Sequence, residues 1–304
     1  SSLLLEMFFT QNLEVSPAKL KFPQWHLRML GDRPRLEFYR DIIRESVEGK
    51  VVLDVGAGNG VLSYLALQAG ATHVYAVEHS EVFQTLFSHM LKGPIDEGRV
   101  TLLKEDAMML GPSDFKHGPP SVVVSELFSA DLFRENVVEI LTTLQNNLPD
   151  ARLSFLPELM ELWVSPTQCQ SLDASFPLED FEGFPLSRLN GLRREPPHWV
   201  NYRAAQLFPM AAMGPEVMIY HGNLGQLKTQ GDLEFNCVLP AGTTHLRLYF
   251  KLRSAGHEYD SSKLTLDSHW PNILFYVPPK LRAHGRAHVT LNAKNNGFQS
   301  ADFR

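Results

Sequence analysis

The pattern of apolar residues divides the chain into two parts. In the first part, runs with the period of a strand alternate with runs with the period of a helix. Because the two kinds of run alternate, residues 1–150 are predicted to form an N-terminal helical segment and an α/β domain with a doubly wound parallel sheet. The strand-like runs lie at 51–55, 73–77, 100–103 and 121–124, and the helical runs lie at 34–45, 61–69, 82–91 and 137–144.

The second part, residues 151–304, is dominated by apolar residues at every second position. The clearest run is His245–Arg253, in which four apolar side chains share one face. This pattern predicts an antiparallel β-barrel or sandwich. The stretch 171–199 fits neither period and is rich in Phe, Pro and Leu, so we expect it to leave the β domain as an excursion. Further strand-like runs lie at 158–164, 217–220, 273–277 and 288–291.

Charge and composition exclude several classes of function. The 304 residues carry a net charge of −6, which disfavours direct binding to nucleic acid and suits a cationic partner. Cys169 and Cys237 are the two cysteines, with no metal-ligand spacing, so we expect neither a disulfide framework nor a metal site. There is no apolar run of about 20 residues and no signal-peptide pattern. We therefore expect no membrane association and a location in the cytosol or the nucleus.

A glycine-rich turn follows the first strand-like run. Gly56, Gly58 and Gly60 stand between a strand and a helix, where glycine lets the backbone turn tightly and approach a ligand. Glu78 ends the next strand, where a carboxylate can accept both hydroxyls of a ribose. The combination predicts a nucleotide-type cofactor, and a nicotinamide-binding fold is the alternative. Asp54 could orient the turn or contact the cofactor.

Two glutamates flank the loop that follows the fourth strand-like run. Glu126 and Glu135 lie at the carboxyl edge of the predicted sheet, where ligands of open α/β folds bind. Two carboxylates can hold the planar, forked donors of a guanidinium and align one nitrogen with a methyl donor. The alternative for Glu135 is a carboxylate that stabilises the start of the next helix.

Several motifs resemble those of known enzymes. The run 52–63 resembles the S-adenosylmethionine (SAM) binding motif of class I methyltransferases, which implies that Glu78 holds the ribose and the glycine turn faces the amino-acid part of SAM. The loop from Glu126 to Glu135 resembles the double-glutamate hairpin of protein arginine N-methyltransferases. Residues 26–35, Ser268-His269-Trp270 and 292–296 resemble further segments of that family.

The resemblance assigns roles to individual residues. It implies that Arg35 lies against the cofactor carboxylate and Glu126, with Met29 also beside the cofactor. It implies that Asp32 pairs with His269 between the two domains, and both join Glu126 and Glu135 in the catalytic set. Phe128 and Trp270 are expected to contact the substrate. Because Phe128 is bulkier than the Met of the main branch, it should crowd the target nitrogen and favour monomethylarginine.

The chain also departs from the family pattern. The usual paired tyrosines are not evident in 16–25, Leu127-Phe128 replaces Trp-Met, and Met108 stands where many members have a glutamate for the adenine. Two hypotheses follow: an enzyme that methylates arginine in protein substrates, or a non-catalytic member that serves as the regulatory subunit of an active paralogue. The stretch 171–199 lies where the family carries its dimerisation arm, which implies a homodimer or a heterodimer.

Overall fold

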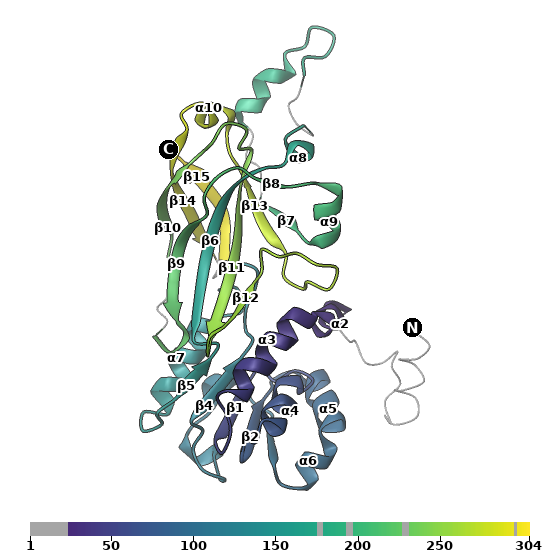
Figure 1. Cartoon of the computed structure of the whole chain (residues 1–304), viewed down its shortest axis with the longest axis vertical. Coiled ribbons are helices and arrows are strands. Elements are labelled where there is room, and N and C mark those ends of the chain that lie inside the picture. The colour runs from purple at the N-terminus through teal and green to yellow at the C-terminus, as the bar shows by residue number, and fades with distance from the viewer. Residues whose placement is uncertain (1–23, 175–178, 193–196, 227–230, 295–296) are drawn as a thin grey trace, which may run out of the picture.

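The computed structural model describes residues 24–174, 179–192, 197–226, 231–294 and 297–304. The α/β part of the chain lies at one end of an elongated molecule and the strand-rich part at the other (Figure 1). Helix α3 (Arg33–Arg44) lies at the junction of the two parts and contacts both α4 (Val61–Gln68) and β12 (His257–Asp260).

The first part contains the predicted doubly wound sheet. Its five strands are all parallel and run in the order β3-β2-β1-β4-β5. The fifth strand lies beyond residue 150, so this sheet extends past the boundary expected from the pattern. The strands are β1 (Val51–Val55), β2 (His73–Val77), β3 (Val100–Leu103), β4 (Val122–Ser125) and β5 (Ser154–Leu156).

Helices pack around this sheet, and their starts and stops follow local chemistry. Asp32 caps α3 by accepting a hydrogen bond from the backbone N–H of Arg35. Gly70, with a φ of 86°, follows the end of α4. The remaining elements of this part are α2 (Gln24–Gly31), α5 (Glu81–Met90), α6 (Lys92–Asp96), η1 (Ala107–Met109), η2 (Pro112–Asp114) and α7 (Val137–Asn147).

The second part is antiparallel, as predicted, but the described strands do not close into a barrel. They form one sheet in the order β7-β13-β11-β6-β8, with β12 and β9 attached, and a second sheet in the order β10-β14-β15. The sandwich alternative therefore describes this part better. Its strands are β6 (Leu159–Gln168), β7 (His198–Val200), β8 (Ala211–Ala212), β9 (Val217–Asn223), β10 (Leu233–Val238), β11 (His245–Ser254), β12, β13 (Asn272–Tyr276), β14 (Arg286–Lys294) and β15 (Gly297–Phe303), and its short helices are α8 (Gln170–Ala174), η3 (Leu186–Leu192), α9 (Tyr202–Leu207), η4 (Leu224–Gln226) and α10 (Pro279–Arg282).

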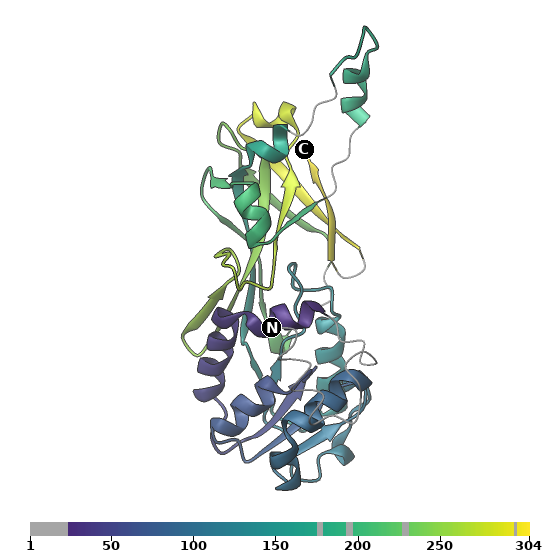
Figure 2. The same cartoon turned by 90° about the vertical axis from the view of Figure 1, so that its right-hand side faces the viewer.

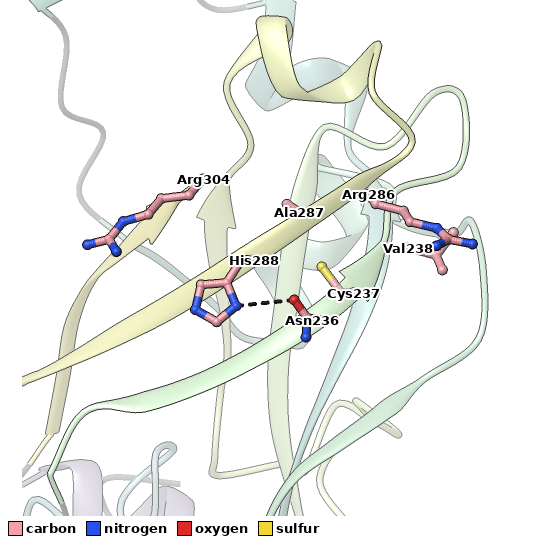
Figure 3. Close-up of a pocket in the computed structure, with 7 residues that line it drawn as sticks. All are labelled: Asn236, Cys237, Val238, Arg286, Ala287, His288 and Arg304. Carbon is pink, nitrogen blue, oxygen red and sulfur yellow. Dashed lines mark hydrogen bonds between the residues drawn. The ribbon is translucent and has the colours of Figure 1, made fainter.

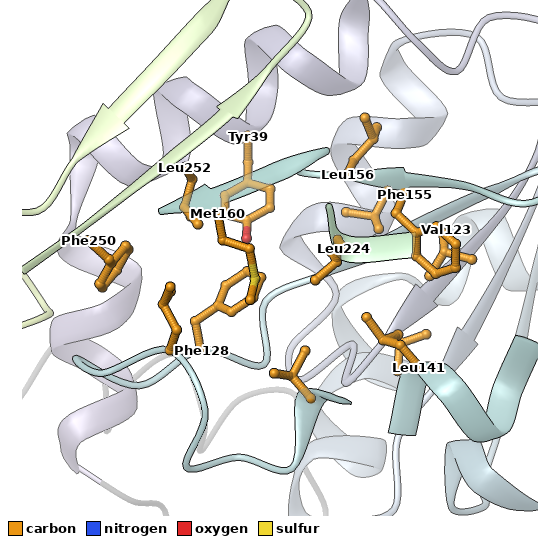
Figure 4. Packing of buried hydrophobic residues seen from close by; sticks show 14 of the residues in the cluster. Tyr39, Val123, Phe128, Leu141, Phe155, Leu156, Met160, Leu224, Phe250 and Leu252 are labelled. Atoms are coloured by element: carbon orange, nitrogen blue, oxygen red, sulfur yellow. The ribbon is translucent and has the colours of Figure 1, made fainter. Parts of the chain in front are cut away.

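One hydrophobic core continues from the first part into the second. The alternating apolar residues of β11 are fully buried in it, as the period-two pattern predicted. Figure 4 shows Tyr39 of α3, Phe128 of the loop after β4, and Met160 of β6 in this core. The loop that carries the two glutamates is therefore attached to both parts of the molecule.

The excursion predicted for 171–199 is visible in its described residues. Residues 179–192 extend away from both sheets at the top of Figure 1, and Figure 2 shows the same projection from the side. Phe181 and Phe184 close a short bridge there and are 66% and 65% exposed. Residues 175–178 and 193–196, which include Phe176, lie outside the described residues.

Candidate functional site

The glycine turn between β1 and α4 has the backbone that its sequence predicted. Gly56, Gly58 and Gly60 have φ values of 75°, 55° and 89°, a region that favours glycine. The backbone N–H groups of Gly56 and Ala57 donate to the Val77 carbonyl at the end of β2, at 3.1 and 3.0 Å. The turn is thereby tied to the strand that leads to Glu78.

Glu78 is buried against the glycine turn. Its Oε2 accepts a hydrogen bond from the Gly58 N–H at 2.9 Å, and its Oε1 accepts one from the Ser80 N–H at 2.8 Å. Glu78 therefore shapes the turn, and a carboxylate oxygen with one bond has a further lone pair for a ligand. A ribose contact of Glu78 stays a prediction.

Asp54 orients the helix that follows the turn. Its Oδ2 accepts a hydrogen bond from the Ser63 hydroxyl of α4 at 2.7 Å. Its Oδ1 is buried and has no hydrogen-bond partner within the described ranges. Burial raises the pKa of Asp54 to about 7, and the charges of Glu126 and Glu78 add to this rise. The orienting role is thus observed, and the free oxygen leaves a cofactor contact open.

Helix α2 covers the glycine turn through a residue that was not among the predicted site residues. A Cβ atom on Gly58 would lie 3.3 Å from Cε1 of His26, and the His26 ring lies 4.4 Å from the ring of Phe83 in α5. Burial and then the charge of Arg35 lower the pKa of His26 to about 4. The only signal in the sequence was its place in the segment 26–35. Met29 lies on the same helix and is partly buried.

Asp32 connects α3 to the strand-rich part. Besides capping α3, its carboxylate accepts hydrogen bonds from the backbone N–H of His269 at 2.8 Å and from the Tyr259 hydroxyl at 3.4 Å. Asp32 and His269 therefore meet between the two parts, as the resemblance implied, and the contact is made by the main chain of His269. Burial raises the pKa of Asp32, while burial and the charge of Arg35 lower the pKa of His269 to about 4.

Arg35 and Glu126 form a buried ion pair. Nη1 of Arg35 donates to Oε2 of Glu126, and the two side chains are 0% and 8% exposed. Nε and Nη2 of Arg35 are buried without a hydrogen-bond partner in the described chain. Burial raises the pKa of Glu126, and the charge of Arg35 opposes the rise. One edge of the Arg35 guanidinium, formed by Nε and Nη2, therefore has no acceptor among the described residues.

The loop after β4 lies directly against the glycine turn. A Cβ atom on Gly56 would lie 2.8 Å from Cδ2 of Leu127, the residue next to Glu126. The Tyr39 hydroxyl of α3 donates to the Ser125 carbonyl at 2.9 Å and fixes the end of β4. The structure thus brings Glu126, Arg35 and the glycine turn together at the carboxyl edge of the sheet, as predicted.

Phe128 and Trp270 are placed differently from their predicted role. They are 2% and 3% exposed, and the indole N–H of Trp270 donates to the Phe128 carbonyl at 2.9 Å. The Phe128 side chain packs in the core (Figure 4). This placement gives both residues a supporting role in the core, and their contact with the substrate stays a prediction.

Glu135 lies at the far end of the loop and faces solvent. Within the described part of the chain it has no hydrogen-bond or ion-pair partner. Displacement of water by the surrounding protein, and then repulsion from Glu126, raise the pKa of Glu135, although solvent screens part of this effect. Helix α7 begins at Val137, and the acidic residue in its first turn is Glu139. Glu135 precedes the helix cap, which argues against the helix-start alternative.

A surface depression also exists in the strand-rich part, away from these residues. It has a volume of about 520 Å³ and is formed along β10 and β14 (Figure 3). His288 and Asn236 hydrogen bond across it at 3.1 Å. None of the predicted site residues lines it.

In the described residues there is no group of three side chains suited to a metal ion, and no helix is long and apolar enough to span a bilayer.

Comparison with known proteins identifies relatives of the chain. No family model matches it. Protein arginine N-methyltransferase 9 of Xenopus laevis is 35% identical over 127 residues, which cover 41% of this chain and 15% of that protein. Protein arginine N-methyltransferase 6 of Danio rerio is 33% identical over 144 residues, which cover 46% and 40%. The chain thus matches less than half the length of these curated relatives.

Solved structures share the fold over nearly the whole chain. The crystal structure of PRMT6 superposes with a TM-score of 0.70 and 21% identity, covering 92% of this chain and 98% of that one. The Trypanosoma brucei PRMT1 enzyme–prozyme heterotetramer gives a TM-score of 0.69 at 18% identity, covering 93% and 98%. The predicted fold is confirmed, and parts of the chain are similar in sequence to protein arginine N-methyltransferases.

Proposed function

We propose that the chain transfers a methyl group from SAM to the guanidinium of arginine in protein substrates. The observation that carries the proposal is the position of Glu126 and its loop, which contact both the glycine turn and a buried arginine at the carboxyl edge of the sheet. Relatives that are named arginine methyltransferases support it, as does the structure of PRMT6 with SAH, which is S-adenosylhomocysteine.

The residues around the glycine turn fit SAM. The unpaired Nε and Nη2 of buried Arg35 are suited to the carboxylate of the amino-acid part, since a guanidinium binds carboxylates in a bidentate way. Glu78 is suited to the ribose hydroxyls, and the glycines leave room for the backbone to approach the ligand. When bound, SAM supplies an electrophilic methyl group, because its sulfonium sulfur departs readily as a neutral thioether.

The two glutamates then act on the substrate. Glu126 and Glu135 hold the guanidinium between them and fix one nitrogen in line with the methyl group, so that positioning and charge supply the acceleration. Arg35 orients Glu126 from the protein side. The nitrogen that gains a methyl group must lose a proton. Glu135, whose pKa is raised and which reaches solvent, is suited to take it.

A second candidate function is that of a regulatory subunit without activity of its own. Met108 lies where many family members have a glutamate for the adenine, and one fold relative is an enzyme–prozyme complex. We prefer the enzyme because both glutamates and Arg35 are present, and because the Arg35–Glu126 pair lies beside a loop that contacts the glycine turn.

We also propose that the chain assembles as a dimer through residues 179–192. Phe181, Phe184 and Leu189 are 66%, 65% and 45% exposed there, which is a large apolar area for a free surface. Tyr64 and Met90, at 49% and 57% exposed, offer apolar contacts on the helices of the first part. The partner is a second copy or a paralogue. Cys169 and Cys237, neither of which forms a disulfide, support the proposal of a cytosolic or nuclear location.

Calorimetric titration with S-adenosylhomocysteine separates the two functions. An enzyme should bind it, and an Arg35→Lys variant should bind it more weakly because lysine cannot supply two parallel N–H donors. Arg152→Lys, an exposed site in the loop before β5, is the matched control. Absence of binding to the wild-type protein would favour the regulatory subunit.

A further inference from the structure

The loop between the two glutamates is held at its centre by contacts with the last hairpin of the chain. Asp131 is fully buried, and its Oδ2 accepts hydrogen bonds from Nε of Arg134 at 2.9 Å and from the backbone N–H of Phe298 at 3.1 Å. Its Oδ1 accepts a bond from the Ser129 hydroxyl. A buried carboxylate with three donors is well satisfied and holds them in a fixed arrangement.

Arg134 extends this arrangement to two strands. Its Nη2 donates to the Phe298 carbonyl at 3.3 Å, and its guanidinium carbon lies 4.6 Å from the ring centre of Trp199 in β7. The backbone N–H of Arg134 donates to the Ser129 hydroxyl at 3.2 Å, which closes the loop on itself. A planar guanidinium can make these contacts together, whereas an ammonium group cannot.

Gly297, the first residue of β15, leaves the space that this arrangement needs. A Cβ atom at this position would lie 2.6 Å from both Cγ of Arg134 and Oδ2 of Asp131. The φ of Gly297 lies outside the left-handed region, so its backbone does not require glycine. The close approach of the loop does require it.

Glu135 depends on its neighbours for its position. Glu126 is fixed by β4 and Arg35, whereas Glu135 has no hydrogen bond or ion pair of its own among the described residues and follows Arg134 directly. We propose that Asp131, Arg134 and Gly297 form a latch that joins the glutamate loop to the β14–β15 hairpin and sets the position of Glu135 relative to Glu126. These are positioning residues, and their role in turnover rests on the proposed function.

Two variants open the latch from opposite sides. Arg134→Lys removes the forked contacts from the loop, and Gly297→Ala inserts a methyl group from the hairpin. Each should speed hydrogen exchange of the backbone in 127–135 and lower kcat/KM for an arginine-rich peptide by roughly 10- to 100-fold, since small misplacements of a reacting group are costly. The affinity for S-adenosylhomocysteine should stay within twofold of wild type, which a general loss of structure would not allow.

Gly111→Ala is the matched control for the alanine change, because it has an extended backbone and nothing within 4 Å of the added atom. Arg152→Lys is the control for the lysine change. Unchanged exchange in 127–135, or kcat/KM within twofold of wild type in both latch variants, overturns the latch. A wild-type protein without methylation activity contradicts the proposed function instead, and the exchange comparison then decides the latch alone.

Discussion

Replacing Asp32 with alanine should destabilise the junction between the two parts of the chain. The change removes the cap of α3, which costs about 1 kcal/mol. It also leaves the His269 N–H and the Tyr259 hydroxyl without their acceptor, at about 1–3 kcal/mol for the partly buried amide and less for the hydroxyl, which is 3.4 Å away. We expect the free energy of unfolding to fall by roughly 3 kcal/mol in total.

Urea unfolding followed by tryptophan fluorescence measures this loss. Asp41→Ala on the same helix is the matched control, because Asp41 forms surface ion pairs with Arg40 and Arg44 that are worth at most about 1 kcal/mol. Tyr259→Phe should fall between the two. If Asp32→Ala and Asp41→Ala unfold at the same urea concentration with the same slope, the junction does not depend on Asp32.

Three further changes have defined outcomes. The pKa of His269 is lower in the folded state than in the unfolded state, so the stability present above pH 6.5 is lost as the pH falls toward 4. Between pH 7 and 4.5, the free energy of unfolding of the wild type should therefore fall by about 2 kcal/mol more than that of His269→Gln in denaturant titrations. Both Gly60 and Gly98 have positive φ, but only at Gly60 would an added Cβ atom lie within 2.9 Å of neighbouring side chains. Gly60→Ala should therefore cost several times more stability than Gly98→Ala, and equal losses would show that backbone strain alone matters. Sedimentation of the double variant Phe181→Ser and Phe184→Ser should report a monomer, and a persisting dimer would exclude residues 179–192 as the interface.

The parts of the fold that follow from local pattern were predictable. The parallel sheet and the strand β11 each bury the residues that their periodicity selects. The strand β5 was missed because its three residues are too short to show a period, and its pairing with β4 is a long-range contact. Closure of a barrel also depends on long-range pairing, which alternation along one strand does not specify.

The site shows the same division. The glycine turn and Glu126 lie where a strand ends, so their places follow from the topology of the sheet. Phe128 is two residues from Glu126, but the turn of the loop directs its side chain into the core. Only the folded chain shows that Asp32 binds the main chain of His269 rather than its ring.

The central claim is that Glu126 and Glu135 hold an arginine guanidinium for methyl transfer. The most direct measurement is mass spectrometry of an arginine-rich peptide and its lysine counterpart after incubation with SAM and the wild-type protein, Glu126→Gln, Glu135→Gln or the control Glu139→Gln. Each site change keeps the shape but removes a charge-assisted contact. We predict that the wild type and Glu139→Gln methylate the arginine peptide and leave the lysine peptide unmodified. Glu126→Gln and Glu135→Gln should methylate neither peptide. Near wild-type turnover by Glu126→Gln at saturating SAM would contradict the claim.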